Sequence, residues 1–518
     1  MGVRKRILRG GGDMLLTLKN LTLKPYQKES ELKKLCERKL RAPCAYFRIL
    51  KKSLDARDKA EIKWVYTVEC SEKPVIRPPR EFEKITKPAP RVYIAGAGPA
   101  GLFCALRLLD HGIRPVVVER GKPVEERARD VEIFRSGGAL DPESNIQFGE
   151  GGAGTFSDGK LNTQTNSPLN REVLERFVEA GAPAEIAYLG KPHIGSDRLR
   201  GVVANMRARI LREGGQIRFS SRLTDVKFRD GKLCAVQING EWEDADELAL
   251  AIGHSARDTF ETLLARGFVV EQKEFAAGVR IEHLQSRVGR AQYGSGYEGL
   301  PAADYKLVSH AGERAAFTFC MCPGGVVVPA ASEEGGFVVN GMSDYARDGR
   351  NANSALVVQV KREDFGSEHP LAGVEFQRRM ERAAFRASGG YRAPVQLVGD
   401  FLADKESYYF GEVTPTCSTG TSFAPVQAYL PPVLVFSLKA ALPDMNGKLA
   451  GFSAFDAVLS GVESRTSSPV RIVRGEDLAA VGKEGVYPCG EGCGYAGGIT
   501  SAAADGLRVA YSIARKYF

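Results

Sequence analysis

The stretch Arg91-Val-Tyr-Ile-Ala-Gly-Ala-Gly-Pro-Ala-Gly101 decides the fold. A short apolar segment runs into three glycines with GxGxxG spacing, and a pattern typical of a helix follows over residues 99–109. A strand, a glycine-rich turn and a helix in this order form a Rossmann-type nucleotide site. Gly96 permits the tight turn, Gly98 lets a diphosphate approach the backbone, and Gly101 allows the helix to pack closely on the strand.

The predicted helix contributes to the same anion site. Its first turn offers unpaired N–H groups and a partial positive charge to a phosphate. Pro99 suits the start of a helix, and Ala100 follows it in the same turn. We therefore expect both residues to lie against the bound nucleotide together with the glycines.

An acidic residue completes the pattern. Glu119 stands 21 residues after Gly98, at the end of the next predicted strand, where a carboxylate accepts hydrogen bonds from a ribose. Arg120, the next residue, is assigned to the same site. A second GxGxxG, Gly294–Gly299, has no apolar strand before it and is followed by Pro301, so we predict a loop there.

Three further segments extend the nucleotide site. Residues 145–161 hold five glycines between 149 and 159, a density that suits a backbone lying close to a flat or anionic ligand. Leu248–Gly253 is a late apolar strand that ends in glycine. In residues 485–506, Glu491 precedes a glycine-rich loop and a helix of small residues. That layout suits a carboxylate on a ribityl chain and a helix N-terminus directed at a flavin ring, which favours FAD rather than NAD.

The pairing of IAGAGPAG, near residue 95, with GEGCGYAGGITSAAADG, near the end, resembles the two-part FAD signature of glutathione-reductase-type flavoproteins. Over about residues 10–518 the chain also resembles a family of bacterial FAD-dependent dehydrogenases of the NAD(FAD)-utilising type. The segments that carry this resemblance are FGEGGAGTFSDGKL, GVRIEH (278–283), FCMCPGG (319–325), NGMS (340–343), NANSA (351–355) and ESRTSSPVRI (463–472). It implies an FAD domain interrupted by a β-rich substrate domain, and it supplies no substrate.

The resemblance also implies which residues contact the cofactor. Gly96, Gly98, Gly101 and Glu119 match the ADP-binding half of the signature. The remaining positions lie in residues 145–161, called the glycine loop below, at the end of the late strand, and in residues 485–506, whose glycine-rich part is called the tail loop. They are Gly152, Thr155, Ser157, Lys160, Gly253, Gly490, Glu491, Gly497, Gly498 and Ile499.

The chain has 518 residues, too many for one hydrophobic core, so two or three domains are expected. Five prolines between residues 71 and 90 indicate a linker. We predict the α/β class, with a Rossmann-type FAD-binding domain that contains a parallel sheet and is built from residues 89–270 and 461–518. A β-rich substrate domain with few helices, residues 271–460, interrupts it. A small basic α+β domain with its linker, residues 1–88, precedes it.

Positive charge is concentrated in the N-terminal part. Residues 1–90 hold 23 Lys+Arg and 11 Asp+Glu, a net +12, so the other 428 residues carry −3 of the chain's +9. A basic surface of this size meets RNA or an acidic partner, or is simply solvated, which is the more common case. Aromatic residues among these charges are few, which weakens the RNA interpretation.

The ten cysteines are scattered, and no Cys/His cluster has zinc spacing. We therefore expect reduced thiols in the cytoplasm and no metal site. No stretch approaches the ~18 apolar residues of a membrane span. The basic, glycine-rich start, residues 1–12, lacks the apolar core of a secretory signal.

Candidates for catalysis are few. Cys320 and Cys322 lie in a predicted strand, so both side chains should point to one face, either as a redox pair near the flavin or as two small buried residues. Cys489 and Cys493 flank the acidic residue of the tail loop and leave the same alternatives open. His254 is either a proton donor near the cofactor or a capping or packing residue.

A flavin carries the hydride or electron chemistry, and the protein positions and shields it. We expect an FAD-dependent oxidoreductase whose small-molecule substrate docks between the FAD domain and the β-rich domain. Since only one Rossmann signature is present, NAD(P)H is expected only as a transient reductant in the substrate cleft. Arg465 and Arg471 have two possible roles. They bind an anionic substrate or the flavin phosphates, or they form ion pairs on the surface. The alternatives are an RNA-modifying flavoprotein that docks tRNA through its basic domain, and a flavin-bound sensor or scaffold without turnover.

Overall fold

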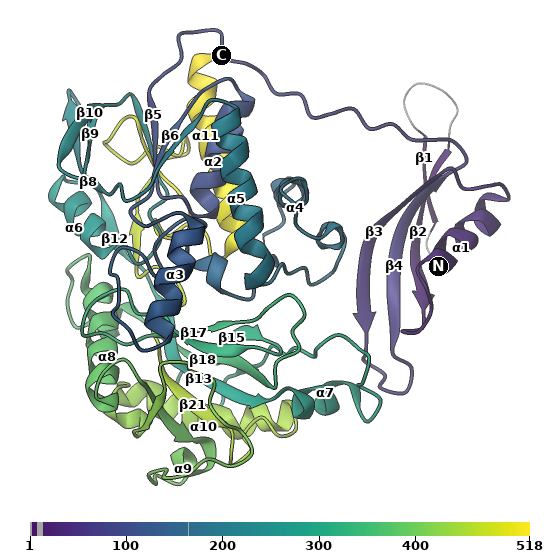
Figure 1. The fold of residues 1–518 in the computed structure, drawn as a ribbon, viewed down its shortest axis with the longest axis vertical. Coiled ribbons are helices and arrows are strands. Elements are labelled where there is room, and N and C mark those ends of the chain that lie inside the picture. The colour runs from purple at the N-terminus through teal and green to yellow at the C-terminus, as the bar shows by residue number, and fades with distance from the viewer. Residues whose placement is uncertain (1–2, 8–13, 164) are drawn as a thin grey trace.

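The computed structural model describes residues 3–7, 14–163 and 165–518. A small N-terminal unit lies beside a larger body in Figure 1. Most of the segment 1–12, in which no secretory signal was expected, lies outside the described residues. In the described part of the chain, no helix has the length and apolar character that crossing a membrane requires.

A five-stranded parallel sheet contains the predicted phosphate turn. In spatial order its strands are β23 (Val486–Pro488), β11 (Glu247–Leu250), β5 (Val92–Ala95), β6 (Val116–Val118) and β7 (Gln216–Arg218). Parallel sheets are covered on both faces, so their strands are continuous apolar runs. Accordingly, β5 is buried at all four of its positions. This sheet confirms the predicted Rossmann-type α/β class.

Successive side chains of β5 point to opposite faces of the sheet. Val92 and Ile94 belong to one apolar cluster, and Tyr93 and Ala95 belong to another. The first cluster includes a helical layer of α2 (Pro99–Asp110), α5 (Ser196–Arg212) and α11 (Ile499–Ala514), with α2 beside α11 in Figure 1. The opposite face is covered by α6 (Arg257–Ala265) and an antiparallel sheet of β8 (Leu223–Arg229), β9 (Lys232–Ile238) and β10 (Glu241–Asp244).

A seven-stranded, mostly antiparallel sheet, called the insertion sheet below, lies in sequence between the two parts of the Rossmann-type region. In spatial order its strands are β14 (Val308–Ser309), β15 (Ala316–Cys322), β18 (Asn351–Val360), β13 (Phe275–Leu284), β21 (Val458–Glu463), β19 (Ala393–Leu397) and β20 (Thr421–Phe423). The strand-rich character predicted for residues 271–460 is confirmed.

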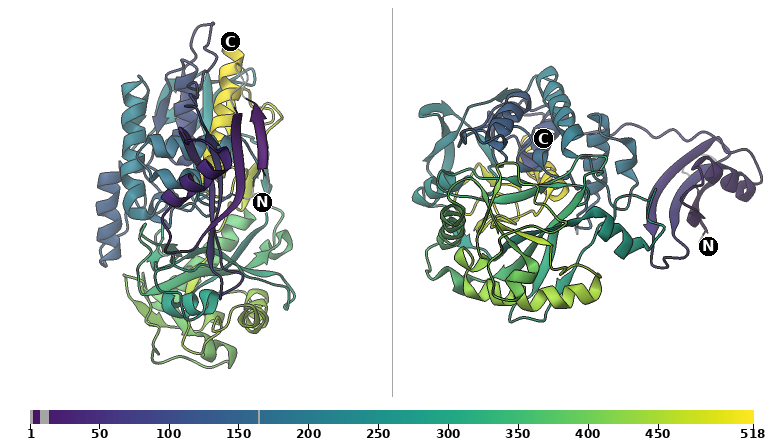
Figure 2. Two further views of the ribbon diagram at one scale, coloured as in Figure 1. Left: turned by 90° about the vertical axis from the view of Figure 1, so that its right-hand side faces the viewer. Right: turned by 60° about the horizontal axis from the view of Figure 1, so that its bottom comes forward.

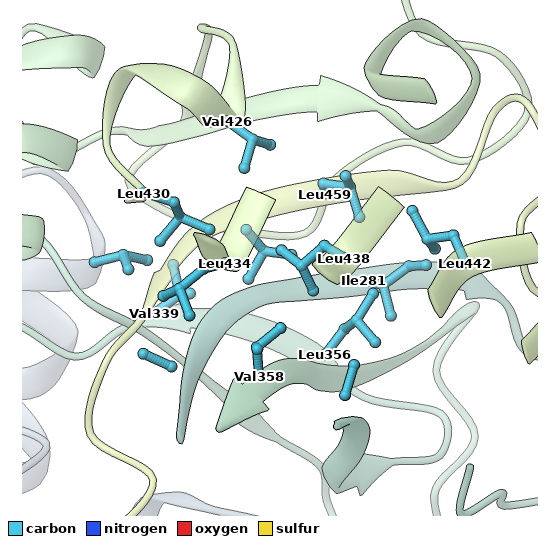
Figure 3. Close-up of a cluster of buried hydrophobic side chains, with 14 of the residues drawn as sticks. Ile281, Val339, Leu356, Val358, Val426, Leu430, Leu434, Leu438, Leu442 and Leu459 are labelled. Atoms are coloured by element: carbon cyan, nitrogen blue, oxygen red, sulfur yellow. The ribbon is translucent and has the colours of Figure 1, made fainter. Parts of the chain in front are cut away.

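Helices cover this sheet more extensively than the sequence indicated. Both α8 (Ala372–Ser388) and α10 (Pro432–Lys448) have 17 residues, so the expectation of few helices was wrong. In α10 the pattern is obscured because Pro443 lies inside the helix. The leucines of α10 nevertheless pack into the apolar cluster that contains Ile281 and Leu459, as Figure 3 shows.

The N-terminal unit is a four-stranded antiparallel sheet with one helix. In spatial order its strands are β1 (Val3–Ile7), which was not predicted, β2 (Met14–Leu23), β4 (Lys63–Ser71) and β3 (Tyr46–Asp55), and α1 (Ser30–Leu40) packs on one face. The unit lies to one side of the body (Figures 1 and 2). Its edge strand β3 reaches the body at Lys52, whose N–H donates to the carbonyl of Tyr188 (2.8 Å) and whose carbonyl accepts from Gly190 (2.7 Å).

The remaining elements connect these layers. They are α3 (Val124–Arg135), α4 (Leu169–Glu179), α7 (Gln285–Tyr293), α9 (Val398–Leu402), β12 (Val270–Gln272) paired with β22 (Val470–Ile472), and β16 (Val326–Pro329) paired with β17 (Val339–Met342). The second GxGxxG, Gly294–Gly299, forms the predicted loop after α7. The division into domains at residues 88, 270 and 460 stays a prediction.

Gly101 should be intolerant of any side chain. A Cβ at Gly101 would lie 1.9 Å from the carbonyl oxygen of Gly96, so Gly101→Ala should lower the free energy of unfolding by about 1–3 kcal/mol. Gly201→Ala in α5 is the matched control, because a Cβ there meets no atom within 4 Å and alanine favours the helix by up to ~1 kcal/mol. Urea denaturation of both variants, followed by circular dichroism, measures the difference. Equal midpoints would contradict the packing argument.

Candidate functional site

Loops from four parallel strands meet at one edge of the sheet. The chain crosses from β5 to β6 on one side, and β11 lies on the other side of β5, so the strand order reverses at β5. Ligands of open α/β sheets bind at the carboxyl ends of the strands at such a point. The segments that leave these ends are 96–98 after β5, 119–121 after β6, 251–256 after β11 and 489–491 after β23.

These segments line one long cavity, which encloses about 1720 Å³ of space, open solvent at its mouth included. Two helices begin at its wall, α2 after Gly98 and α11 after Gly498. The first-turn N–H groups of a helix have no partner within the helix, and they carry a partial positive charge. The cavity therefore holds two places that favour an electron-rich ligand group.

Glu119 joins three segments at one end of the cavity. Its carboxylate accepts N–H groups from Ala97 (2.8 Å), Gly121 (2.9 Å) and Gly149 (2.9 Å). A carboxylate has about four acceptor sites, so capacity remains for a ligand hydroxyl. Glu119 therefore organises the phosphate turn and can also bind a ribose.

Arg120 lies at the same end. Its guanidinium lies 4.1 Å from the ring centre of Phe148, and it donates hydrogen bonds to Glu143 (2.7 Å) and Asp258 (2.9 Å). Both Arg120 and Phe148 line the cavity. A stacked guanidinium and ring form a flat surface of the kind on which an aromatic base can lie.

The glycine loop is held in place by an arginine that the sequence analysis missed. Arg127, on α3, is fully buried and donates to the carbonyl groups of Asn145 (2.9 Å), Ile146 (3.0 Å) and Glu150 (2.6 Å). A Cβ at Gly149 would lie 2.3 Å from Cδ of this arginine. Burial lowers the pKa of Arg127 to about 10, so the side chain stays charged at neutral pH.

Beyond Arg127 the glycine loop runs along the cavity. A Cβ at Gly152 would lie 3.2 Å from Cα of Gly98, and a Cβ at Gly154 would lie 2.9 Å from Cγ1 of Ile499. The loop therefore passes the phosphate turn first and the tail loop second. The glycine loop therefore follows the long axis of the cavity, from the Glu119 end toward the residues after 154.

The tail loop lies against the end of β11. A Cβ at Gly492 would lie 2.3 Å from the carbonyl oxygen of Gly253, so two loops that are distant in sequence are in backbone contact. The carboxylate of Glu491 lines the cavity and has no hydrogen bond to the described residues. Burial raises the pKa of Glu491 to about 7, against the lowering influence of Lys273. Hydroxyl groups of a ligand would supply the donors that this side chain lacks.

The far end of the cavity is built jointly with the insertion. Asp158 accepts hydrogen bonds from Nε of Arg347 (2.9 Å) and from Ser343. Lys160 lines the cavity beside this pair, and its Nζ lies 3.9 Å from Asp158. The glycine loop is thereby joined to the chain that leaves β17.

Cys320 and Cys322 line this end, but the expectation that their side chains share one face was wrong. A register shift after Phe319 and a φ of +42° at Cys320 interrupt the strand, leaving Cys320 exposed and Cys322 buried. Nη2 of Arg280 lies 3.8 Å from Sγ of Cys322. Burial raises the pKa of the Cys322 thiol. Since the thiolate is the nucleophile, a buried neutral thiol at Cys322 is a poor partner for Cys320 in redox exchange.

Cys489 and Cys493 lie on opposite faces of the parallel sheet. Cys489 belongs to the cluster under the helical layer, and Cys493 belongs to the opposite cluster, where its thiol donates to the carbonyl of Leu250 (3.2 Å). Burial raises the pKa of Cys493 to about 12 and that of Cys489 well above its usual value. This arrangement favours the packing alternative for both residues.

His254 lines the cavity, and its buried Nε2 has no hydrogen-bond partner among the described residues. Burial, reinforced by Arg465 and Arg257, lowers its pKa to about 3, so the ring is neutral. Arg465 forms a buried pair with Glu381 (3.0 and 2.8 Å) and donates to two serines, so it is not a surface ion pair. Arg471 is exposed.

Most of the residues predicted to contact the cofactor lie around the cavity. Gly101 and Gly490 do not line it but serve close packing, since a Cβ at Gly490 would lie 2.8 Å from Cβ of Ala100. Thr155 does not line it either, because it is buried behind Gly151. The predicted residues that do line the cavity are Gly96, Gly98, Pro99, Ala100, Glu119, Arg120, Gly152, Ser157, Lys160, Gly253, Glu491, Gly497, Gly498 and Ile499.

The cavity fits an extended dinucleotide with a flat ring. A Cβ at Gly253, Gly497 or Gly498 would point into open space, so bare backbone forms the wall there. The carboxylate of Glu491 and Nε2 of His254 lack partners that a bound ligand would provide. A strand reversal with a phosphate turn at one end and a glycine-lined wall at the other defines the class of Rossmann-type flavoproteins.

Comparison with known proteins identifies the family. Residues 274–466 match the family described as FAD-dependent protein, C-terminal domain-like, and residues 16–71 match a domain of unknown function, DUF8436. An uncharacterized protein of Clostridium beijerinckii is 46% identical over 491 residues, which cover 90% of this chain and 92% of that protein. The chain belongs to this family of FAD-dependent proteins, and its cofactor is FAD. The comparisons do not confirm the narrower NAD(FAD)-utilising dehydrogenase family that the sequence resembles.

Other similarities are partial or distant. Aklavinone 12-hydroxylase DnrF of Streptomyces peucetius subsp. caesius is 28% identical over 159 residues, 29% of this chain and 32% of that protein. The L-proline dehydrogenase from P. horikoshii is 10% identical with a TM-score of 0.35, covering 84% of this chain and 95% of that chain. CtdE in complex with FAD is 11% identical with a TM-score of 0.32, covering 82% and 84%. At these TM-scores the structural similarities carry no argument about the reaction.

The raised pKa of Glu491 predicts a pH effect on the cofactor-free protein. Because the folded pKa of about 7 lies above the ordinary value of 4.5, the folded state binds the proton more tightly, and stability falls as the pH rises from 4.5 to 7. Glu491→Gln removes this dependence, so its free energy of unfolding relative to the wild type should increase over that range and level off above it. Urea denaturation at several pH values measures this. The exposed Glu476→Gln is the control and should follow the wild type, whereas identical behaviour of both variants would refute the prediction.

Proposed function

We propose that the protein is an FAD-dependent oxidoreductase, a dehydrogenase that transfers a hydride between an organic substrate and N5 of the flavin. The observation that carries the proposal is a single cavity that passes two helix N-termini, that of α2 and then that of α11, and ends between the Rossmann-type sheet and the insertion. Bound FAD supplies the hydride-accepting chemistry. The protein supplies position, charge and exclusion of water.

The Glu119 end is assigned to the adenosine diphosphate part of the cofactor. Backbone N–H groups at Gly98 and Ala100 hold the diphosphate, supported by the N-terminus of α2. The free acceptor capacity of Glu119 binds a ribose hydroxyl. The flat surface formed by Arg120 and Phe148 lies against the adenine. This assignment is supported because Gly98, Ala100, Glu119, Arg120 and Phe148 all line the cavity.

The other end is assigned to the ribityl chain and the flavin ring. Glu491, a partly buried carboxylate that lines the cavity, accepts hydrogen bonds from the ribityl hydroxyls. The backbone from Gly497 to Ile499 lies against the ring, next to Gly154 of the glycine loop. The substrate then approaches from the side of Phe319 and Asn340, which belong to the insertion.

The electron donor and the location of the protein are further parts of the proposal. Among the described residues only one GxGxxG forms a phosphate turn, so NAD(P)H would bind transiently in the substrate cleft and not in a domain of its own. All ten cysteines are free thiols, which supports a reducing compartment such as the cytoplasm. The comparisons do not support a nucleic-acid partner for the basic N-terminal unit.

Gly98→Val tests the cofactor site. The residue has φ −77° and ψ −176°, which valine adopts easily, and a Cβ would have only Cα of Gly152 nearby, at 3.8 Å. The variant should therefore fold and lose FAD affinity by about ten-fold or more, because its side chain occupies the place of the diphosphate. Reconstitution with FAD, followed by flavin fluorescence, measures this affinity.

The matched control for that variant lies in the other GxGxxG sequence. Gly296→Val changes the middle glycine of a motif that forms a surface loop, where a Cβ meets nothing within 4 Å. It should bind FAD as the wild type does. If both variants kept their FAD, or if the wild type bound none, the proposed cofactor site would be wrong.

Anaerobic stopped-flow reduction separates an enzyme from a flavin-bound scaffold. The FAD-loaded protein is mixed with NADH or with NADPH, and the loss of oxidised-flavin absorbance is recorded. An oxidoreductase that uses a nicotinamide donor should be reduced by one of the two at about 1 s⁻¹ or faster, within the usual range of turnover. Reduction that takes hours with both donors would instead favour the scaffold.

A further inference from the structure

Lys160 occupies a distinctive place at the far end of the cavity. The glycine loop reaches Ile499 at Gly154, and Lys160 follows six residues later, beyond the part of the wall assigned to the flavin ring. Its Nζ donates no hydrogen bond to the described residues, and its only ion-pair contact among them is Asp158 at 3.9 Å. Lys160 is therefore a cation at the substrate end that the protein itself does not engage closely.

The acidic partner of Lys160 is already occupied. Asp158 receives Nε of Arg347 at 2.9 Å and a second guanidinium nitrogen of the same residue, and it also receives the hydroxyl of Ser343. Its two oxygens are thus engaged by stronger donors. At 3.9 Å, Lys160 is too far away to share them through a hydrogen bond.

Arg280 and Glu463 form the other ion pair at this end, and Arg280 has no free donor for a ligand. Arg280 is fully buried, and it donates to Glu463 (2.8 Å), Asn353 (2.8 Å) and the carbonyl of Cys320 (2.7 Å). All of its nitrogens are engaged, so it has no donor left for a ligand. Arg347 and Arg280 are thus each hydrogen-bonded to an acidic partner, whereas Lys160 makes no such hydrogen bond to the described residues.

The rest of this end is neutral. Phe319 contributes an aromatic ring, Cys320 and Cys322 contribute neutral thiols, and Asn340 contributes a carboxamide. One cation in such surroundings favours a group with one negative charge, because a doubly charged phosphate would stay half unpaired in a partly desolvated site.

We propose that the substrate is a monoanionic carboxylate and that Lys160 binds its carboxylate group beside the flavin ring. The inference rests on the proposed function, because the assignment of this end to the substrate follows from the placement of FAD. A compact ammonium on a flexible stem suits this role, since it can follow the carboxylate as the substrate enters. Lys160 is then a specificity-determining residue of the insertion side of the cavity.

The test uses the FAD-loaded protein and two probes of nearly equal shape, benzoate and benzamide, with acetate as a smaller anion. Binding is followed through the change in the oxidised-flavin spectrum at constant ionic strength. Benzoate should produce a saturable change, and benzamide should bind about ten-fold or more weakly. Lys160→Gln should abolish this preference for the anion, and Lys160→Arg should retain most of it.

Lys232→Gln is the matched control. Lys232 also forms a 3.9 Å ion pair, with Glu484, but it is an exposed residue at the start of β9 and does not line the cavity, so the variant should bind benzoate as the wild type does. The proposal is overturned if benzamide binds as well as benzoate, if Lys160→Gln keeps the wild-type affinity for benzoate, or if neither benzoate nor acetate alters the spectrum. A protein that holds no FAD at all would instead refute the proposed function, which the colour of the sample shows before any probe is added.

Discussion

Three backbone N–H groups converge on the carboxylate of Glu119, and the geometry of the cavity depends on this contact. The three donors come from the turn after β5, from the chain after β6 and from the glycine loop. A buried carboxylate is tolerated only when it is hydrogen-bonded. Moving any of the three segments away would break a hydrogen bond to the buried Glu119 carboxylate, so this contact holds the segments together. Arg127 complements this arrangement, because it is a buried cation surrounded by carbonyl oxygens of the same glycine loop. An anion among N–H groups and a cation among carbonyl groups fix the loop, whose regular secondary structure is one short 3-10 helix, Ala153–Phe156.

Local sequence predicted the parts of the fold that depend on local geometry. The phosphate turn and the late apolar strand β11 follow from glycine spacing and from apolar runs. The helices of the insertion were underestimated, because Pro443 interrupts the pattern of α10 and burial against the sheet compensates for it. The cysteine geometry was missed because a bulge at Cys320 cannot be derived from alternation alone. Arg127 and Arg465 carry no motif, and only their three-dimensional surroundings distinguish them from surface arginines.

The insertion is joined to the Rossmann-type region by buried charge as well as by apolar contact. Arg257, on α6, and Arg465, after β21, both bind Glu381, on α8, and all three side chains are almost completely buried. Burial alone would raise the pKa of Glu381, but the two guanidinium groups outweigh it and hold that pKa well below its usual range. Removal of one partner from such a cluster leaves an uncompensated charge, which typically costs about 3–5 kcal/mol. The two regions are therefore coupled next to the cavity wall that Ser255 and Arg465 share.

The contact between α2 and α11 has a consequence for biosynthesis. A Cβ at Gly506 would lie 2.1 Å from the carbonyl oxygen of Ala100, so the last long helix is seated directly on the helix of the phosphate turn. The ribosome makes about 5–20 residues per second, so the nearly 400 residues between these two helices take about 20–80 seconds to appear. During that interval the face of α2 that packs on α11 has no partner, and the part of the cavity wall that comes from residues 489–502 does not yet exist. The complete cofactor cradle can therefore form only after the C-terminal helix has been made.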